Sequence, residues 1–244
     1  MQKLFESHAD YNMIWLGDDQ QFVARFDTAA TPFQIAVLGL YTQPDSLTKP
    51  KILSALHDTL PLQGWHTLSI VLPRSTNTST DQSTIPAEPT EEDTASAEKT
   101  VNDDTASKAN TIDPRAIAHV KAALDFLQSQ QVRSVALITD NAHIALALNT
   151  VVTHKGFVSG LILWQVDHKS VKTETLKTLK TSRVSILDIS GDNQTKQQFT
   201  QRKQQFARAD FTKDYKPLIL SDTTPSSISV KRIRYWLENE FRKY

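Results

Sequence analysis

The sequence predicts an α/β fold in which a mostly parallel β-sheet carries helices on both faces. Short apolar runs of strand length alternate along the chain with segments of helical periodicity. The apolar runs are continuous, which is typical of parallel strands buried between two helix layers. Six such strands are expected, over residues 34–40, 65–72, 134–138, 158–166, 183–189 and 215–220.

Helices are predicted between these strands. Residues 52–60 place four apolar side chains at helical spacing and end near Gly64. Asp113 is the expected N-cap of the next helix, with Pro114 at its first position. The other helices are expected over residues 142–154, residues 171–179, a long polar segment that contains Phe199 and Phe206, and residues 228–241.

The chain is predicted to form one α/β domain, built from residues 1–73 and 113–244. Between them, residues 74–112 are rich in Ser, Thr, Asp and Glu and contain no aromatic residue. We expect a disordered insertion, because this composition buries too little apolar surface to offset the entropy of ordering; an acidic lid or docking tail is the alternative. Upstream, residues 12–16 and 21–26 are expected to add an antiparallel hairpin to the sheet edge.

The overall composition excludes several classes of function. The 244 residues include 27 Lys plus Arg, 27 Asp plus Glu and no cysteine, so the net charge favours neither nucleic acid nor an acidic membrane surface, and thiol chemistry is absent. The longest apolar stretch, residues 158–166, is too short to span a membrane. Residues 1–10 lack the layout of a signal peptide, so we expect a cytoplasmic protein, with a periplasmic location as the alternative.

A site is expected where the strands of the parallel sheet end, because ligands of such sheets bind outside the carboxyl ends of the strands. This rule selects a pocket for an unknown small molecule or protein, lined by Tyr41, Arg74, Asp140, Asn141, His143, His168, Asp192 and Asp222. No strand-to-helix turn contains more than one glycine, so no dinucleotide or other cofactor is expected. A metal site built from Asp140, His143, His168 and Asp192 is disfavoured, because no helix face pairs His with Asp.

Four segments carry a family resemblance: GWHTLSIVLP, RSVALITDN, ILDISGDN and KRIRYWL. Together with the order of elements and the insertion after the second core strand, they resemble a proteobacterial family of uncharacterised α/β-hydrolase-like proteins. The resemblance covers nearly the whole chain except the insertion and implies a three-layer α/β-hydrolase fold. In active hydrolases of this fold the nucleophile lies in a strained turn, G-x-S-x-G, between a strand and a helix.

The resemblance aligns this turn with residues 139–143 (TDNAH), which places Asn141 at the nucleophile position. An amide is a very poor nucleophile, although Asn tolerates the left-handed backbone conformation that the turn requires. His143 replaces the second glycine and is expected to push strand and helix apart, relaxing the turn. Asp140 is interpreted as an N-cap. The acid of the triad would lie near Asp192, whereas residues 221–229 (SDTTPSSIS) contain no histidine that could serve as the base.

The sequence therefore favours a non-catalytic α/β-hydrolase-like protein that serves as a ligand-binding or protein-interaction scaffold. The alternative is an atypical ester or amide hydrolase that uses Ser75, Ser190 or Asp140 with His168 or His143. A third reading, nucleic-acid binding by the basic residues of the last helix, is disfavoured, because that helix also carries acidic residues and lacks interleaved aromatic side chains.

Overall fold

A computed structural model of the chain describes nine stretches of the sequence. They are residues 12–18, 22–29, 34–41, 51–73, 112–171, 173–191, 196–211, 214–220 and 226–241. The predicted insertion, apart from Ile112, lies outside the described residues.

Eight strands form one sheet in the order β1-β2-β4-β3-β5-β6-β7-β8. The neighbours from β4 through β8 are parallel, whereas β1 pairs with β2 and β2 with β4 in antiparallel orientation. The mostly parallel sheet and the antiparallel N-terminal hairpin are thus both confirmed. The strands are β1 (Met13–Leu16), β2 (Phe22–Asp27), β3 (Ile35–Tyr41), β4 (His66–Val71), β5 (Ser134–Thr139), β6 (Val158–Trp164), β7 (Ser185–Ser190) and β8 (Tyr215–Ile219).

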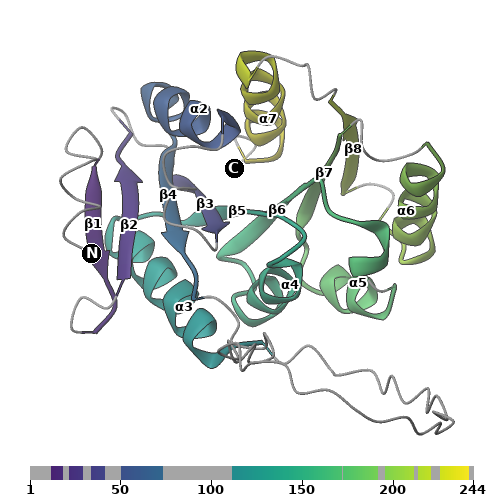
Figure 1. The fold of residues 1–244 in the computed structure, drawn as a ribbon, viewed down its shortest axis with the longest axis horizontal. Coiled ribbons are helices and arrows are strands. Elements are labelled where there is room, and N and C mark those ends of the chain that lie inside the picture. Colours follow the sequence, from purple (N-terminus) through teal and green to yellow (C-terminus); the bar gives the residue numbers. More distant parts are fainter. Residues whose placement is uncertain are drawn as a thin grey trace, which may run out of the picture.

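The helices form two layers, one on each face of the sheet. The described α-helices are α2 (Lys51–Thr59), α3 (Pro114–Ser129), α4 (Ile144–Thr153), α5 (Thr173–Lys180), α6 (Lys196–Arg208) and α7 (Ser226–Phe241). Helices α2 and α7 cover one face, and α3, α4, α5 and α6 cover the other (Figure 1). As predicted, Asp113 caps α3: its side chain accepts a hydrogen bond from the backbone N–H of Arg115.

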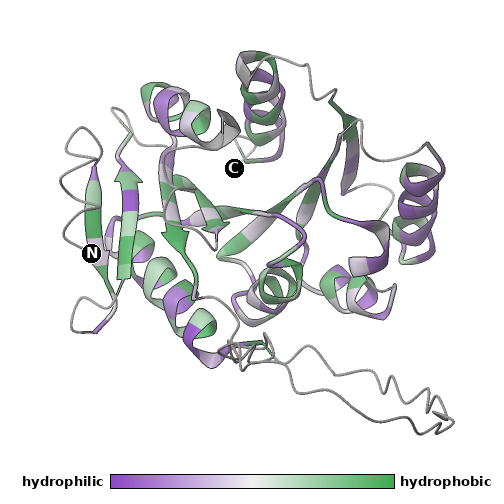
Figure 2. Ribbon diagram, in the orientation of Figure 1, coloured by the Kyte–Doolittle hydropathy of each residue, from purple (hydrophilic) through white to green (hydrophobic). Residues whose placement is uncertain are grey.

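Each face of the sheet has its own hydrophobic core. One core joins the strands to α3, α4, α5 and α6, and the other joins them to α2 and α7 around the fully buried Trp65. Strand β3 is buried at every position, as expected for a central parallel strand. Figure 2 shows hydrophobic central strands and a mostly hydrophilic α6, which contacts the core mainly through Phe206. Two cores on one sheet establish the three-layer α/β fold.

Several helices end in a residue with a left-handed backbone. After α3, the N–H of Gln131 (φ 63°) donates to the carbonyl of Gln128, and the N–H of Val132 donates to that of Leu127. This is the Schellman arrangement, which favours glycine because a Cβ is strained there. Asp210 (φ 64°) occupies the equivalent position after α6. Non-glycine residues therefore hold both turns at some cost in stability.

Replacing Gln131 by glycine should stabilise the fold by about 1 kcal/mol, because glycine adopts the left-handed conformation without strain. The change is measured as a higher urea midpoint of unfolding. Gln130→Gly is the matched control: its φ is −83°, so glycine gains nothing there and should lower the midpoint. Equal effects of the two variants would contradict the assignment of strain to Gln131.

Candidate functional site

The turn between β5 and α4 lies at the carboxyl edge of the sheet and is organised by the Asp140 carboxylate. One carboxylate oxygen, Oδ1, accepts hydrogen bonds from the backbone N–H of Ala142 (3.0 Å) and of His143 (3.3 Å). The N-cap of α4 is His143, so the interpretation of Asp140 as the N-cap residue is wrong by three positions. Asp140 instead stabilises the loop that leads into the helix.

Asp140 and His143 also form a side-chain pair. His143 Nδ1 donates to Asp140 Oδ1 over 2.8 Å. Burial raises the pKa of Asp140, but the hydrogen bonds from His143 and from the two backbone N–H groups outweigh it and hold the pKa below its ordinary value. The carboxylate is therefore ionised at neutral pH, and its side chain is 45% exposed. A neutral His143 in this orientation keeps a lone pair on Nε2.

Asn141 ties the turn to the loop that follows β6. Its Oδ1 accepts hydrogen bonds from the backbone N–H of Asp167 (3.1 Å) and from the hydroxyl of Ser170 (2.6 Å). None of the residues 139–143 has a positive φ, so Asn141 does not adopt the left-handed conformation of a nucleophile turn. The turn therefore lacks the backbone strain of a nucleophile turn. Asn141 therefore acts as a bridge between two loops.

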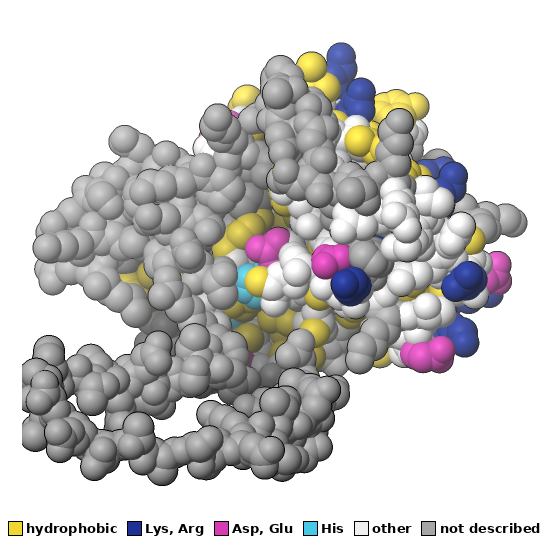
Figure 3. Space-filling view, turned by 45° about the vertical axis from the view of Figure 1, so that its right-hand side comes forward, with side chains coloured by type: hydrophobic (Ala, Val, Ile, Leu, Met, Phe, Trp, Pro, Cys, Tyr) yellow, Lys and Arg dark blue, Asp and Glu magenta, His cyan; other side chains and the backbone are white. Residues whose placement is uncertain are grey.

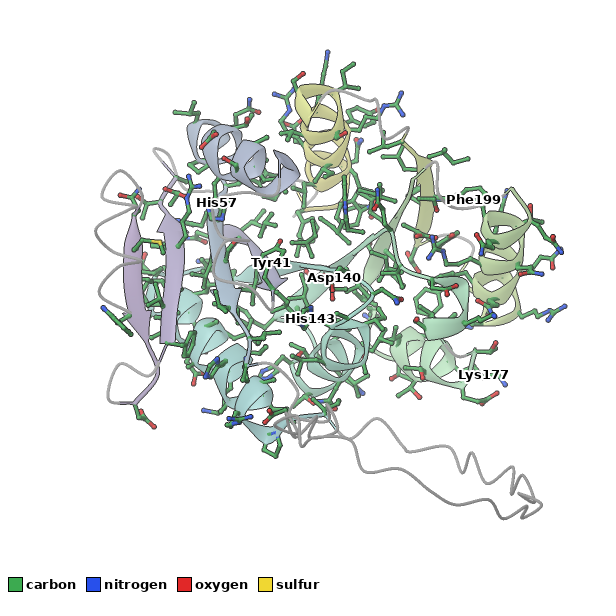
Figure 4. The ribbon with its side chains drawn as sticks, in the orientation of Figure 1. Tyr41, His57, Asp140, His143, Lys177 and Phe199 are labelled. Carbon is green, nitrogen blue, oxygen red and sulfur yellow. The ribbon has the colours of Figure 1, made fainter. Side chains whose placement is uncertain are left out.

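Tyr41, at the end of β3, lies beside this pair. Figure 4 shows Tyr41, Asp140 and His143 close together at the edge of the sheet. The Tyr41 ring packs over Gly39, where an added Cβ would lie 2.6 Å from the hydroxyl. The hydroxyl is buried and has no hydrogen-bond partner among the described residues. Burial raises the pKa of Tyr41 well above its ordinary value, and the negative charge of Asp140 raises it further, so the phenol stays protonated.

The other residues predicted for the site are only partly described. Arg74, Asp192 and Asp222 lie outside the described residues, as does Ser75. The backbone of His168 begins a short 3-10 helix, His168–Ser170, at this edge, while its side chain is outside the description. The structure therefore brings Tyr41, Asp140, Asn141 and His143 together from the predicted set.

Ser190, the other serine considered as a nucleophile, belongs to a buried structural network. Its hydroxyl accepts a hydrogen bond from Arg202 Nη2 over 2.8 Å and is almost fully buried. A guanidinium stays protonated and cannot accept the proton of a nucleophile. The same Arg202 pairs with Asp188 through Nε at 2.7 Å. The interpretation of Ser190 as a nucleophile is therefore wrong.

A buried Asp–His–Ser chain lies away from the predicted site, beneath α2. His57 Nδ1 donates to Asp27 Oδ2 over 2.5 Å, and His57 Nε2 accepts from the hydroxyl of Ser69 over 2.7 Å. This is the hydrogen-bond order of a serine-hydrolase triad. The cavity beside it measures about 10 Å³, however, which is room for no more than one water molecule. Arg25 also contacts Asp27 (2.9 Å), so the chain is a closed structural network.

His57 is not among the residues that the sequence selects for a site, although the sequence contains a signal for its burial. His57 lies four residues after Leu53 and three before Leu60, on the apolar face of its helix. A polar residue at such a position is buried and needs partners. The partners come from β2 and β4, which periodicity alone does not identify.

The described part of the chain shows no group of three or more His, Asp or Glu side chains arranged to hold a metal ion. None of the helices that the structure describes combines the length and the apolar content of a membrane span.

Solved structures share this fold at low sequence identity. Est1E from Butyrivibrio proteoclasticus has a TM-score of 0.58 at 8% identity, over 93% of this chain and 98% of Est1E. An alpha-beta serine hydrolase homologue from Coxiella burnetii has a TM-score of 0.54 at 13% identity, over 93% and 96% of the two chains. XC6422 from Xanthomonas campestris, a serine hydrolase without a lid, has a TM-score of 0.56 at 11% identity, over 96% and 94%.

These likenesses show an α/β-hydrolase fold. No curated protein matches the sequence. The sequence does match a family over residues 9–239, most of its length. The chain therefore belongs to the family described as Protein of unknown function (DUF3530).

Proposed function

We propose that the protein is a non-catalytic member of the α/β-hydrolase fold that binds a ligand at the carboxyl edge of its sheet. The observation that carries the proposal is Asn141. The family resemblance aligns it with the nucleophile position, its amide oxygen accepts two hydrogen bonds, and its backbone does not adopt the left-handed conformation. An amide held in this way neither attacks a carbonyl nor loses a proton near neutral pH.

The partners that a serine hydrolase needs also do not come together in the described part of this edge. Ser170 donates its hydroxyl hydrogen to Asn141, and His143 donates to Asp140. No serine hydroxyl hydrogen bonds to a histidine among these described residues, whereas catalysis requires a base that removes the serine proton.

Tyr41 and Asp140 indicate what such a site would recognise. The protonated hydroxyl of Tyr41 is a donor that has no partner among the described residues, and the ionised Asp140 is an acceptor that remains partly exposed. A neutral polar group with one acceptor and one donor, such as an amide or an alcohol, complements this pair. The proposal is therefore a binding site for a small polar molecule.

A fluorophosphonate probe and short-chain p-nitrophenyl esters test the absence of serine-hydrolase chemistry. The wild-type protein should show neither labelling nor turnover, while an active esterase of the same fold, run in parallel, should show both. Labelling or turnover that disappears on replacing Ser75 or Asp140 would overturn the proposal.

Asn141→Ser should remain inactive in the same assays, because the turn lacks the left-handed conformation of a nucleophile turn and Nδ1 of His143 is hydrogen bonded to Asp140. The variant should also lose about 1 kcal/mol of stability, since it removes the amide that links two loops. Ser170→Ala, which removes one of these hydrogen bonds, is the control for the loss of stability. Ester hydrolysis by Asn141→Ser would show that a competent base exists.

The second candidate is an atypical hydrolase in which His143, oriented by Asp140, activates a water molecule. The Nδ1–Oδ1 distance of 2.8 Å is what favours it. Under this hypothesis, ester turnover is lost in His143→Gln. Turnover that survives in His143→Gln excludes the candidate.

A further inference from the structure

A groove of about 770 Å³ lies between the edge strand β8 and helix α7. Leu187 of β7 and Leu218 of β8 line it together with Trp236 of α7, and all three belong to the core on the α2 side of the sheet. Helix α7 packs against α2 and β7. Among the described helices, none lies over β8 on this side (Figure 1). The layer formed by the described helices on this face therefore ends before β8.

The wall formed by α7 presents apolar side chains to solvent. Ile228 is 44% exposed and Tyr235 is 68% exposed, and their spacing of seven residues puts them on one face of the helix. The indole N–H of Trp236 is buried and has no hydrogen-bond partner among the described residues. Exposed apolar side chains that continue an apolar floor are typical of an interaction surface.

Positive charges border the groove on both sides. Lys216 comes from β8, and Lys231 and Arg232 come from α7. None of these three forms an ion pair with a described residue, in contrast to Arg234, which contacts Gln63 and Glu238. Basic and hydrophobic side chains lie next to one another at the top of Figure 3, the level of α7. Because the whole chain has no net charge, this excess is local and favours an acidic partner.

Pro217 prevents a partner from pairing a further strand with the outer edge of β8. The carbonyl of Asp214 accepts a hydrogen bond from β7, and the N–H of Leu220 donates one to β7. Because the backbone groups of successive residues in a strand alternate between its two sides, the odd-numbered residues of β8 direct their N–H and C=O groups away from β7. Pro217 is the central one of these residues and has no N–H to donate. The outer edge of β8 is thus protected against pairing, and an occupant must contact the side chains of the groove.

We propose that this groove binds an acidic amphipathic helix of a partner protein. The apolar stripe of such a helix covers Leu187, Leu218 and the exposed Tyr235, and acidic residues on either side of the stripe meet the cations of both walls. A nucleic acid would satisfy the cations but would leave the apolar floor uncovered. The bound helix completes the layer beside α7. This inference is independent of the site at the carboxyl edge.

Fluorescence anisotropy with a designed peptide tests the proposal. The probe is a labelled helix of about 18 residues with leucine at positions i, i+3, i+4 and i+7 and glutamate on the flanks. The full chain should bind it in the micromolar range, and the double variant Lys231→Glu and Arg232→Glu should weaken binding at least about tenfold. Ile228→Ser with Tyr235→Ser should weaken it as well, because the apolar contact is lost.

The matched control is Lys177→Glu with Lys203→Glu, which makes the same change in net charge on α5 and α6, on the opposite face of the sheet (Figure 1). This control should bind like the wild type. A scrambled peptide of the same composition and a single-stranded oligonucleotide of equal charge are the competing ligands. The proposal is overturned if either competing ligand binds as tightly as the designed helix or if no binding is detected at about 1 mM peptide. It is also overturned if Lys231→Glu with Arg232→Glu binds the peptide as tightly as the control variant does.

Discussion

Asp188→Ala is expected to destabilise the protein by about 3–5 kcal/mol, because it leaves the guanidinium of Arg202 buried without its counter-charge. Asp188 is fully buried and Arg202 is 1% exposed. Their Nε–Oδ2 distance is 2.7 Å, and the Tyr215 hydroxyl donates to the same oxygen over 2.6 Å. The pair joins α6 to β7 and β8. Its loss should appear as a large drop in the urea midpoint of unfolding.

Two further variants separate the free-energy cost of leaving a buried charge unpaired from the net contribution of the ion pair to stability. Replacing Asp188 by Leu, Arg202 by Met and Tyr215 by Phe together removes every charge and should recover most of the lost stability. Asp125→Ala breaks the exposed pair between Lys121 and Asp125 and should leave the midpoint unchanged. If Asp188→Ala lowered the urea midpoint as little as Asp125→Ala does, this result would contradict the burial of the pair between Asp188 and Arg202.

The wild-type protein is expected to lose stability as the pH falls below about 6.5, through the network under α2. Burial lowers the pKa of His57 from its ordinary value of 6.5, and the hydrogen bond to Asp27 offsets this only in part. The folded state therefore binds fewer protons at His57 than the unfolded state does in this range. The stabilising contribution is present above pH 6.5 and is lost as the pH falls through the lowered pKa.

Protonation of Asp27 also lowers the stability of the folded protein, at a lower pH than protonation of His57 does. Burial raises its pKa, but hydrogen bonds from His57 and Asn12 outweigh this, so the pKa lies below the ordinary 3.8 and stability is lost as the carboxylate is protonated. Each titrating group contributes a slope of up to about 1.4 kcal/mol per pH unit. Urea midpoints measured from pH 8 to pH 4 report the combined slope.

His57→Gln should flatten this slope between pH 6.5 and 4, because it removes the titrating group from the network. Burial also lowers the pKa of His66 and of His119, so part of the slope should remain. His154→Gln, at the end of α4 and outside the network, is the matched control and should keep the full slope. An unchanged slope in His57→Gln would rule out His57 as its source.

Much of the candidate site was predictable, because the carboxyl ends of parallel strands meet at one edge. Tyr41, Asp140 and His143 were selected by this rule and lie together in the structure. The partners of their side chains were not predictable. Asn141 contacts Asp167 and Ser170, which follow a different strand, and that contact depends on how two loops pack.

The sequence by itself determined the order of strands and helices, the cap at Asp113 and the absence of a serine at position 141, because periodicity and turn chemistry are local properties of the chain. Only the tertiary structure decided that Asn141 does not adopt a left-handed backbone, that His57 joins Asp27 to Ser69, and that β8 lies beside a groove. Each of these depends on strand register and on packing between residues far apart in the chain, which no local pattern encodes.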